Sequence, residues 1–203
     1  MKKIMFKDRF GLTEAVLSGK KTMTRRILKC PKKFKGVEDV ELEFHKRLGQ
    51  DFYYDCVVVD GNGHELGQLP LPYEIGDVVA IAQSYHSLNK SGFVAPERCE
   101  HTCESSFGYK NKMYVKAELM PHHIRITDLW FERLQDISDE DCLREGIKKT
   151  DCVAPYGFPV GNGKWKNYRT PQDAFACLID KVSGTGTWDS NPWVVAYTFE
   201  LVD

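Results

Sequence analysis

The stretch "GLTEAVLSGKKTMTRRIL", residues 11–28, contains a change from helical to strand-like periodicity. Leu12, Ala15 and Val16 share one face of a predicted short helix, and Gly19 is placed to end that helix in a left-handed conformation. Beyond the glycine, side chains are expected to alternate between the two faces of a strand. A helix that runs directly into a strand is therefore the first predicted unit of the fold.

Positive charge is concentrated at this junction, where Lys20, Lys21, Arg25 and Arg26 lie close together in the sequence. Strand alternation predicts that Thr24 and Arg26 point the same way. The whole chain has a net charge of -1, with 28 Lys and Arg against 29 Asp and Glu. Because no overall field would draw the molecule onto nucleic acid, any anion site must be local.

Composition indicates one folded domain over residues 1–203. A hydrophobic content of 42% is enough to bury a core. Seven cysteines, an odd number, fit a reducing compartment better than a disulfide framework. Charged residues interrupt the apolar run near the N-terminus, and no later run reaches the length of a membrane span. We therefore expect a cytoplasmic protein with no membrane partner.

Further strands and helices are predicted along the chain from periodicity and turn residues. Strands are expected in a hairpin over 53–67, in 73–85, in 111–119 and 122–134 as antiparallel neighbours, and in 193–202 as a closing strand. Helices are expected within 137–146, with Ser138 as N-cap and Gly146 as the stop, and within 169–184, with Thr170 before Pro171.

Mostly antiparallel strands with a few short helices predict a mainly β, α+β fold. We expect a small β-barrel with helices at its ends. Segments of about 30–70, 87–110 and 148–169 have weaker periodicity over much of their length, and we interpret them as insertions within the single domain.

The run "MFKDRFGLTEAVLSGKKTMTRR", residues 5–26, closely resembles the opening of ASCH domains, which are relatives of the PUA RNA-binding fold. Three later segments agree with this resemblance in the expected order: "IGDVV" at 75–79, "LREGI" at 143–147 and "NPWVVAYTFEL" at 191–201. Together they cover roughly half of the chain. The resemblance implies a PUA-like barrel.

The resemblance also implies a chemistry, because a compact bacterial member of the family hydrolyses the acetyl amide of N4-acetylcytidine. The lysine, threonine and glutamate of that member correspond to Lys21, Thr24 and Glu145 here. A threonine hydroxyl is a weak nucleophile, and a lysine whose pKa is lowered by burial or by neighbouring cations can activate it. Glu145 would face the negative end of a helix dipole, so a cationic partner such as Lys21 would explain its presence.

Other residues are expected to contact the ligand. Arg26 suits a phosphate, a carboxylate or a base edge. The segment "GKWKNYR", residues 163–169, mixes aromatic and cationic side chains, as proteins that bind unstacked bases do. The same segment could instead be a loop that caps the barrel. The predicted substrate-binding residues are Lys20, Arg25, Arg26, Trp165 and Tyr168.

The segment "CEHTC" places Cys99, His101 and Cys103 close together. Zinc sites usually pair such residues with a second, distant pair of ligands, and none is obvious here. His122 and His123 are adjacent, so on a strand they would point to opposite faces. We therefore predict no metal and no cofactor.

The leading hypothesis is an amidohydrolase that acts on an acylated nucleoside. The second hypothesis is a non-catalytic module that binds single-stranded RNA in the same cleft, and a ribonuclease is the third, although no histidine pair supports it. The basic cluster could also be only a solvated surface. An enzyme needs Lys21 and Thr24 within hydrogen-bond reach of each other in a closed pocket, whereas an RNA binder needs an open basic groove with exposed aromatic side chains.

Overall fold

A computed structural model of the chain describes residues 1–203 except 47, 50, 91, 93–107 and 203. The α-helices are α1 (Leu12–Leu17), α2 (Tyr85–Lys90), α3 (Asp139–Arg144) and α4 (Pro171–Ser183). The 3-10 helices are η1 (Asp8–Phe10), η2 (Lys112–Tyr114), η3 (Ala117–Leu119) and η4 (Leu134–Asp136). The strands are β1 (Lys3–Ile4), β2 (Met23–Ile27), β3 (Lys33–Phe34), β4 (Val37–Glu38), β5 (Glu41–Lys46), β6 (Tyr53–Val59), β7 (Glu65–Gln68), β8 (Val78–Ile81), β9 (His123–Arg133), β10 (Lys148–Lys149), β11 (Tyr156–Gly161), β12 (Lys164–Tyr168) and β13 (Trp193–Leu201).

The main sheet has the strand order β1-β8-β9-β13-β2. Its pairs are antiparallel except β1 with β8, which is parallel. Strand β6 joins the sheet through Tyr53 opposite Phe131 and pairs in turn with β5 and β7. The prediction of a mainly β, α+β fold is confirmed. Among the described residues, the strand ladders do not close into a barrel.

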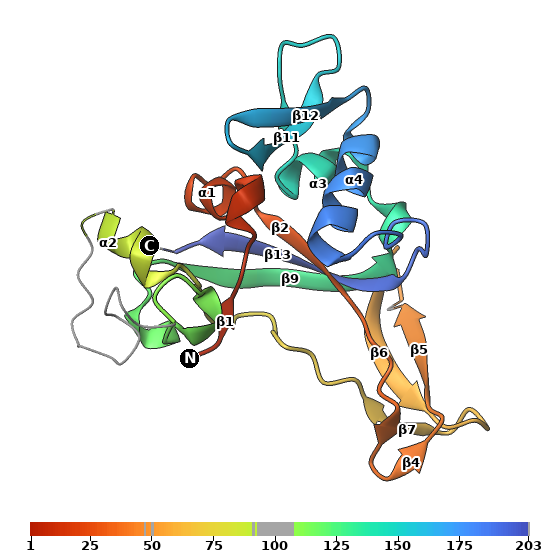
Figure 1. The fold of residues 1–203 in the computed structure, drawn as a ribbon. Coiled ribbons are helices and arrows are strands. Elements are labelled where there is room, and N and C mark those ends of the chain that lie inside the picture. Colours follow the sequence, from red (N-terminus) through yellow and green to blue (C-terminus); the bar gives the residue numbers. More distant parts are fainter. Residues whose placement is uncertain (47, 50, 91, 93–107, 203) are drawn as a thin grey trace.

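Helices α1, α3 and α4 gather on one side of β2, β9 and β13 (Figure 1). A second sheet, β10-β11-β12, lies beyond them, and strands β4 to β7 extend from the other end of the molecule. The largest buried cluster joins the helices to the main sheet, since Val16, Phe175 and Leu178 belong to the same cluster as Val195 and Tyr197. The N-terminal part of β2 therefore lies where this helical layer meets the sheet.

The junction between α1 and β2 forms as the sequence predicts. Gly19 has φ +68°, and the backbone N–H groups of Lys20 and Lys21 both donate to the Ala15 carbonyl at 2.9 and 2.8 Å. This left-handed end satisfies helix carbonyls that would otherwise be unpaired. Lys21 therefore lies directly after a helix end whose backbone is held in place by hydrogen bonds.

Helix α3 also begins and ends where the sequence predicts. The Ser138 hydroxyl accepts a hydrogen bond from the Asp141 N–H at 3.1 Å. Gly146 has φ +108°, and the Ile147 N–H donates to the Cys142 carbonyl at 3.2 Å. The chain therefore turns sharply just after Glu145.

The prediction of a strand over 111–119 is wrong, because the structure has η2 and η3 there. The Asn111 side chain accepts from the Met113 N–H at 3.0 Å, a local bond that favours a turn over a strand ladder. Val115 and Ala117 are buried in a second, smaller apolar cluster with Tyr85. The neighbours of β9 are instead β8, β13 and β6.

Two of the segments that were predicted as insertions contain more strands than their sequences suggest. Strands β3, β4 and β5 lie within residues 30–50, and strands β10, β11 and β12 lie within 148–169. Four of the five residues of β12 are exposed, and β3 and β4 have two residues each. Such exposed or very short strands carry no apolar alternation by which they could be recognised, whereas β5 does, since Leu42 and Phe44 alternate with Glu41 and Glu43.

Candidate functional site

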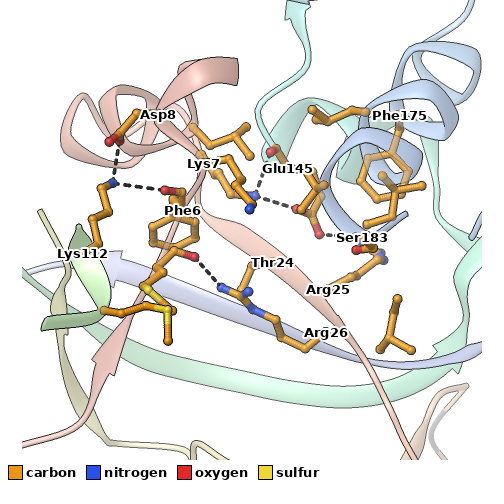
Figure 2. Close-up of a pocket in the computed structure, with 18 of the residues that line it drawn as sticks. Phe6, Lys7, Asp8, Thr24, Arg25, Arg26, Lys112, Glu145, Phe175 and Ser183 are labelled. Atoms are coloured by element: carbon orange, nitrogen blue, oxygen red, sulfur yellow. Dashed lines mark hydrogen bonds and ion pairs between the residues drawn. The ribbon is translucent and has the colours of Figure 1, made fainter. Parts of the chain in front are cut away.

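A pocket of about 860 Å³ lies between the helical layer and the N-terminal end of β2 (Figure 2). Its wall comes from five segments: the start of α1 with the chain before it, β2 with Lys21 just before it, the η2 region, the end of α3, and α4. The lining residues are Met5, Phe6, Lys7, Asp8, Leu12, Lys21, Thr24, Arg25, Arg26, Ile27, Lys110, Asn111, Lys112, Met113, Glu145, Phe175, Leu178, Ile179, Val182 and Ser183. The structure therefore brings Glu145 to the same pocket as Lys21, Thr24 and Arg26.

Lys21 is buried, with only 2% of its surface exposed. Its ammonium group donates to the Met23 carbonyl at 2.6 Å, to the Glu145 carbonyl at 2.7 Å and to Glu145 Oε2 at 2.6 Å. These bonds use all three donors of the ammonium group. Burial lowers the pKa of Lys21 below its ordinary value of 10.5, while the Glu145 carboxylate acts in the opposite direction.

Glu145 is the C-cap residue of α3 and is also buried. A carboxylate at this end of a helix faces the partial negative charge of the unpaired carbonyls. Lys21 at 2.6 Å and Arg25 Nη1 at 3.4 Å from the carboxylate oxygens offset that repulsion. The sequence-based expectation that Glu145 meets a cation such as Lys21 agrees with this geometry.

Arg25 has a fully buried side chain that contacts three carboxylates. Its Nε donates to Glu132 Oε1 at 2.6 Å, and its Nη2 donates to Asp141 Oδ2 at 3.0 Å. Burial alone would lower the pKa of Arg25, but Glu145, Glu132 and Asp141 outweigh burial and raise it. Arg25 lines the pocket, yet its guanidinium is occupied by protein groups and joins β2 to α3 and β9.

Thr24 lies opposite Tyr197 in the β2–β13 ladder and is largely buried. Its side chain lines the pocket, as the close-up shows (Figure 2). Within the described part of the chain, the Thr24 hydroxyl makes no hydrogen bond, and Lys21 Nζ donates to other acceptors. Thr24 therefore presents a hydroxyl that is available to a ligand.

Arg26 lies on the same strand face as Thr24, as alternation predicts. Its Nη2 donates to the Met5 carbonyl at 3.1 Å, and its guanidinium carbon lies 5.9 Å from the centre of the Phe6 ring. Lys21 Nζ lies 5.7 Å from the same ring centre. Phe6 therefore contacts both cations, and attraction between cation and ring favours this arrangement.

The sequence did not identify several lining residues. Lys112 Nζ donates to the Phe6 carbonyl at 3.1 Å and to Thr13 Oγ1 at 2.9 Å, and it pairs with Asp8. A strand was expected at Lys112, so nothing pointed to its role. In α4, the apolar residues that pack in the core also line the pocket: Phe175, Leu178, Ile179 and Val182.

Three of the predicted substrate-binding residues lie elsewhere. Lys20 is exposed and does not line the pocket. Trp165 is 44% exposed on β12, with Lys148 Nζ 5.6 Å from its ring centre. Tyr168 stacks on Phe158 and borders a separate, open hollow. The structure therefore does not bring them to the pocket that holds Thr24.

The cysteine and histidine motif at Cys99, His101 and Cys103 lies outside the described residues. Within the described residues, no group of three or more His, Cys, Asp or Glu side chains is arranged to hold a metal ion. The described helices include none that is long and apolar enough to cross a membrane. Comparisons of the chain with protein-family models, curated proteins and solved structures found no match.

Proposed function

We propose that this protein is an ASCH-like, PUA-like amidohydrolase that removes the acyl group from an acylated nucleoside. One observation carries the proposal: Glu145 lines the same pocket as Lys21 and Thr24, although it lies more than a hundred positions from them in the sequence. The available Thr24 hydroxyl and the lowered pKa of Lys21 are the properties that nucleophilic amide cleavage requires.

The proposed reaction starts from the neutral amine of Lys21, with the Glu145 carboxylate 2.6 Å away. A neutral amine is less penalised by burial than an ammonium ion, and burial lowers the pKa of Lys21 accordingly. The Thr24 oxygen then attacks the acyl carbon, and its proton passes to the Lys21 amine. Lys21 next protonates the leaving nitrogen, and the C–N bond breaks to leave an acyl ester on Thr24.

Water completes the cycle by hydrolysing the ester. The Glu145 carboxylate takes a proton from water as the water attacks the acyl carbon, and it passes that proton to the Thr24 oxygen as this oxygen leaves. The C–O bond to Thr24 breaks, the carboxylic acid leaves, and the threonine hydroxyl is restored. Positive charge in the pocket wall favours the oxyanion that develops in both steps.

The test is turnover of N-acylated nucleosides by the purified protein, followed by chromatography. Thr24→Val retains the branched shape of threonine and removes only the hydroxyl, which has no partner in the described residues. We expect it to fold normally and to lose about 100-fold or more of kcat/KM. Thr24→Ser should retain part of the activity.

Intact mass spectrometry should detect acylated wild-type protein, and no acylated Thr24→Val protein. No turnover of any acylated nucleoside by the wild type, or full activity in Thr24→Val, would contradict the proposal.

One observation favours RNA binding as a second candidate function. Trp165 is exposed on β12 between the exposed residues Lys164 and Lys166, and Lys148 lies over its ring. Stacking of an unpaired base on such a ring contributes about 1–3 kcal/mol. Trp165→Ala should weaken binding of single-stranded RNA by that amount and leave duplex binding unchanged. Equal RNA affinities for the two proteins would exclude this surface.

A further inference from the structure

The six cationic residues of the pocket wall fall into two groups. Lys21, Arg25 and Lys112 have their side-chain nitrogens engaged by carboxylates and other protein acceptors. The other group, Lys7, Arg26 and Lys110, makes no ion pair among the described residues. Among the described lining residues, Asp8 and Glu145 are the only carboxylates, so this part of the wall has an excess of positive charge, although the whole chain has a net charge of -1.

Arg26 has free donors at the pocket. Its only hydrogen bond within the described residues runs from Nη2 to the Met5 carbonyl. Arg26 Nη1 makes no hydrogen bond within the described residues. In that part of the chain, Nε is buried without a partner, whereas Nη1 is not one of the buried unpaired atoms. A guanidinium has five N–H donors, so most of them are available to a ligand. The interaction with Phe6 holds the group in place without using those donors.

Lys112 holds together the two segments that carry Lys7 and Lys110, the other two cations without an ion pair among the described residues, at the rim of the pocket. Its bonds to the Phe6 carbonyl and to Asp8 fix the η2 region against the chain before α1. Lys7 lies between Phe6 and Asp8, the two residues that Lys112 binds, and Lys110 lies two positions before Lys112. Both lysines are exposed and line the pocket. In Figure 2 the Arg26 guanidinium turns towards this same segment.

We infer that the pocket takes a phosphate-bearing nucleotide, with the phosphate held by Lys7, Arg26 and Lys110 and the acylated base directed to Thr24. This inference rests on the proposed function and names its substrate class. A phosphate monoester carries nearly two negative charges at neutral pH, which suits three unpaired cations better than a neutral nucleoside does. The paired cations, Lys21 and Arg25, lie instead at the Glu145 end of the pocket.

The test measures binding and so does not depend on turnover. Cytidine, cytidine 5′-monophosphate, inorganic phosphate and a cytidine derivative with a 5′-carboxylate are titrated into the purified protein by calorimetry. We expect the monophosphate to bind about tenfold tighter than cytidine or better, with the carboxylate between them. The affinity for the monophosphate should fall as salt is added, whereas the affinity for cytidine should not change.

The variants are chosen so that the fold is unaffected. Lys7→Ala combined with Lys110→Ala removes two exposed side chains and should abolish most of the preference for the phosphate, with little change for cytidine. Lys29→Ala is the matched control, because Lys29 is exposed, lies outside the pocket and makes no ion pair among the described residues. It should bind both ligands as the wild type does.

Equal affinities for cytidine and its monophosphate, or a preference that survives the double change, would overturn the inference. Tighter binding of an RNA oligomer than of the mononucleotide would also overturn it. If the monophosphate binds as expected but no acylated nucleoside or nucleotide is cleaved, the phosphate site stands and the proposed amidohydrolase does not.

Discussion

Lys21 contributes both to the proposed reaction and to the stability of the fold. A lysine in a loop ordinarily adds little to a core. Lys21 differs, because it is buried and its three donors hold the end of α3 and the start of β2 together. Its removal would leave the Glu145 carboxylate buried with only the longer contact to Arg25.

Lys21→Ala should therefore lower the free energy of unfolding by about 3–5 kcal/mol, since an uncompensated buried charge is strongly unfavourable. The measurement is urea denaturation followed by circular dichroism. The paired replacement, Lys21→Met with Glu145→Met, should recover most of the loss because it removes both charges together. A loss below about 1 kcal/mol for the single variant would show that the pair is not buried in solution.

The pH dependence of turnover should also identify Lys21. Burial lowers its pKa below 10.5, and in the proposed reaction the neutral amine is the form that accepts the Thr24 proton. Activity therefore rises as pH increases through this lowered pKa and levels off above it. The profile of kcat/KM should show this limb at a pH below the ordinary lysine range. A limb centred at or above 10.5 would contradict a buried Lys21 as the base.

At the scale of elements, two glycines with positive φ fix the helix ends that hold the site. Gly19 ends α1, and a Cβ placed there would have no atom within 4 Å. Gly146 ends α3, and a Cβ there would lie 3.1 Å from Leu12 Cδ2 and 3.5 Å from Lys21 Cδ. A substitution at Gly19 therefore tests backbone strain alone, whereas one at Gly146 tests backbone strain together with packing against Leu12 and Lys21.

Gly19→Ala should destabilise the protein by about 1 kcal/mol through backbone strain alone. Gly146→Ala should cost about 2–3 kcal/mol, because the added methyl also displaces Leu12 or Lys21. Thermal unfolding of the two variants measures the difference. Only the second change should also reduce turnover, and equal effects of the two substitutions on stability and activity would rule out this contact.

The turn before β8 carries its own pH dependence. The Asp77 carboxylate accepts from Lys2 Nζ at 2.7 Å and from the Glu74 N–H at 2.9 Å, and these bonds hold its pKa below the ordinary value of 3.8. Because the folded-state pKa is lowered, the stabilisation is present above 3.8 and disappears as pH falls below it. Asp77→Asn should be less stable than the wild type at neutral pH, and the difference should shrink in acid. A difference that stays constant from neutral to strongly acidic pH would contradict this role.

At the scale of the whole molecule, the two largest of the three buried apolar clusters among the described residues differ in size. The larger one joins the main sheet to α1, α3 and α4, whereas the smaller one packs α2 and η3 against the end of β8. Regions with fewer buried apolar contacts open at lower free energy. Hydrogen exchange should therefore be slower in β9 and β13 than in α2 and η3, and bound nucleotide should slow exchange near Lys110. Uniform protection across both regions would contradict this division.

The sequence predicted those features that depend on neighbouring residues. The ends of α1 and α3, the capping of α4 by Thr170 and the hairpin of β6 and β7 each follow from a few adjacent side chains. The mainly β class follows from alternation in the buried strands. Lys21, Thr24 and Glu145 were chosen through a family resemblance, and their shared pocket depends on chain packing that no local pattern specifies.

The remaining features depend on contacts between distant segments. The residues next to Arg25 in the sequence do not indicate that Glu132 and Asp141 neutralise its charge. The one available signal was Glu132 itself, a carboxylate that directly follows apolar residues of β9. The rim lysines, Lys7 and Lys110, come together only because Lys112 ties their segments. Trp165 and Tyr168 had the expected composition for a binding site, yet β12 carries them to another surface.

The buried pairing of Lys21 with Glu145 has a consequence for large-scale mutagenesis. A scan that reports both cellular abundance and catalytic output would find the two quantities falling together at Lys21, Arg25 and Glu145, because each substitution unfolds the protein as it disables the pocket. At Thr24, conservative replacements would leave abundance high and remove output. The catalytic centre would therefore stand out as a single position, surrounded by residues whose importance looks purely structural.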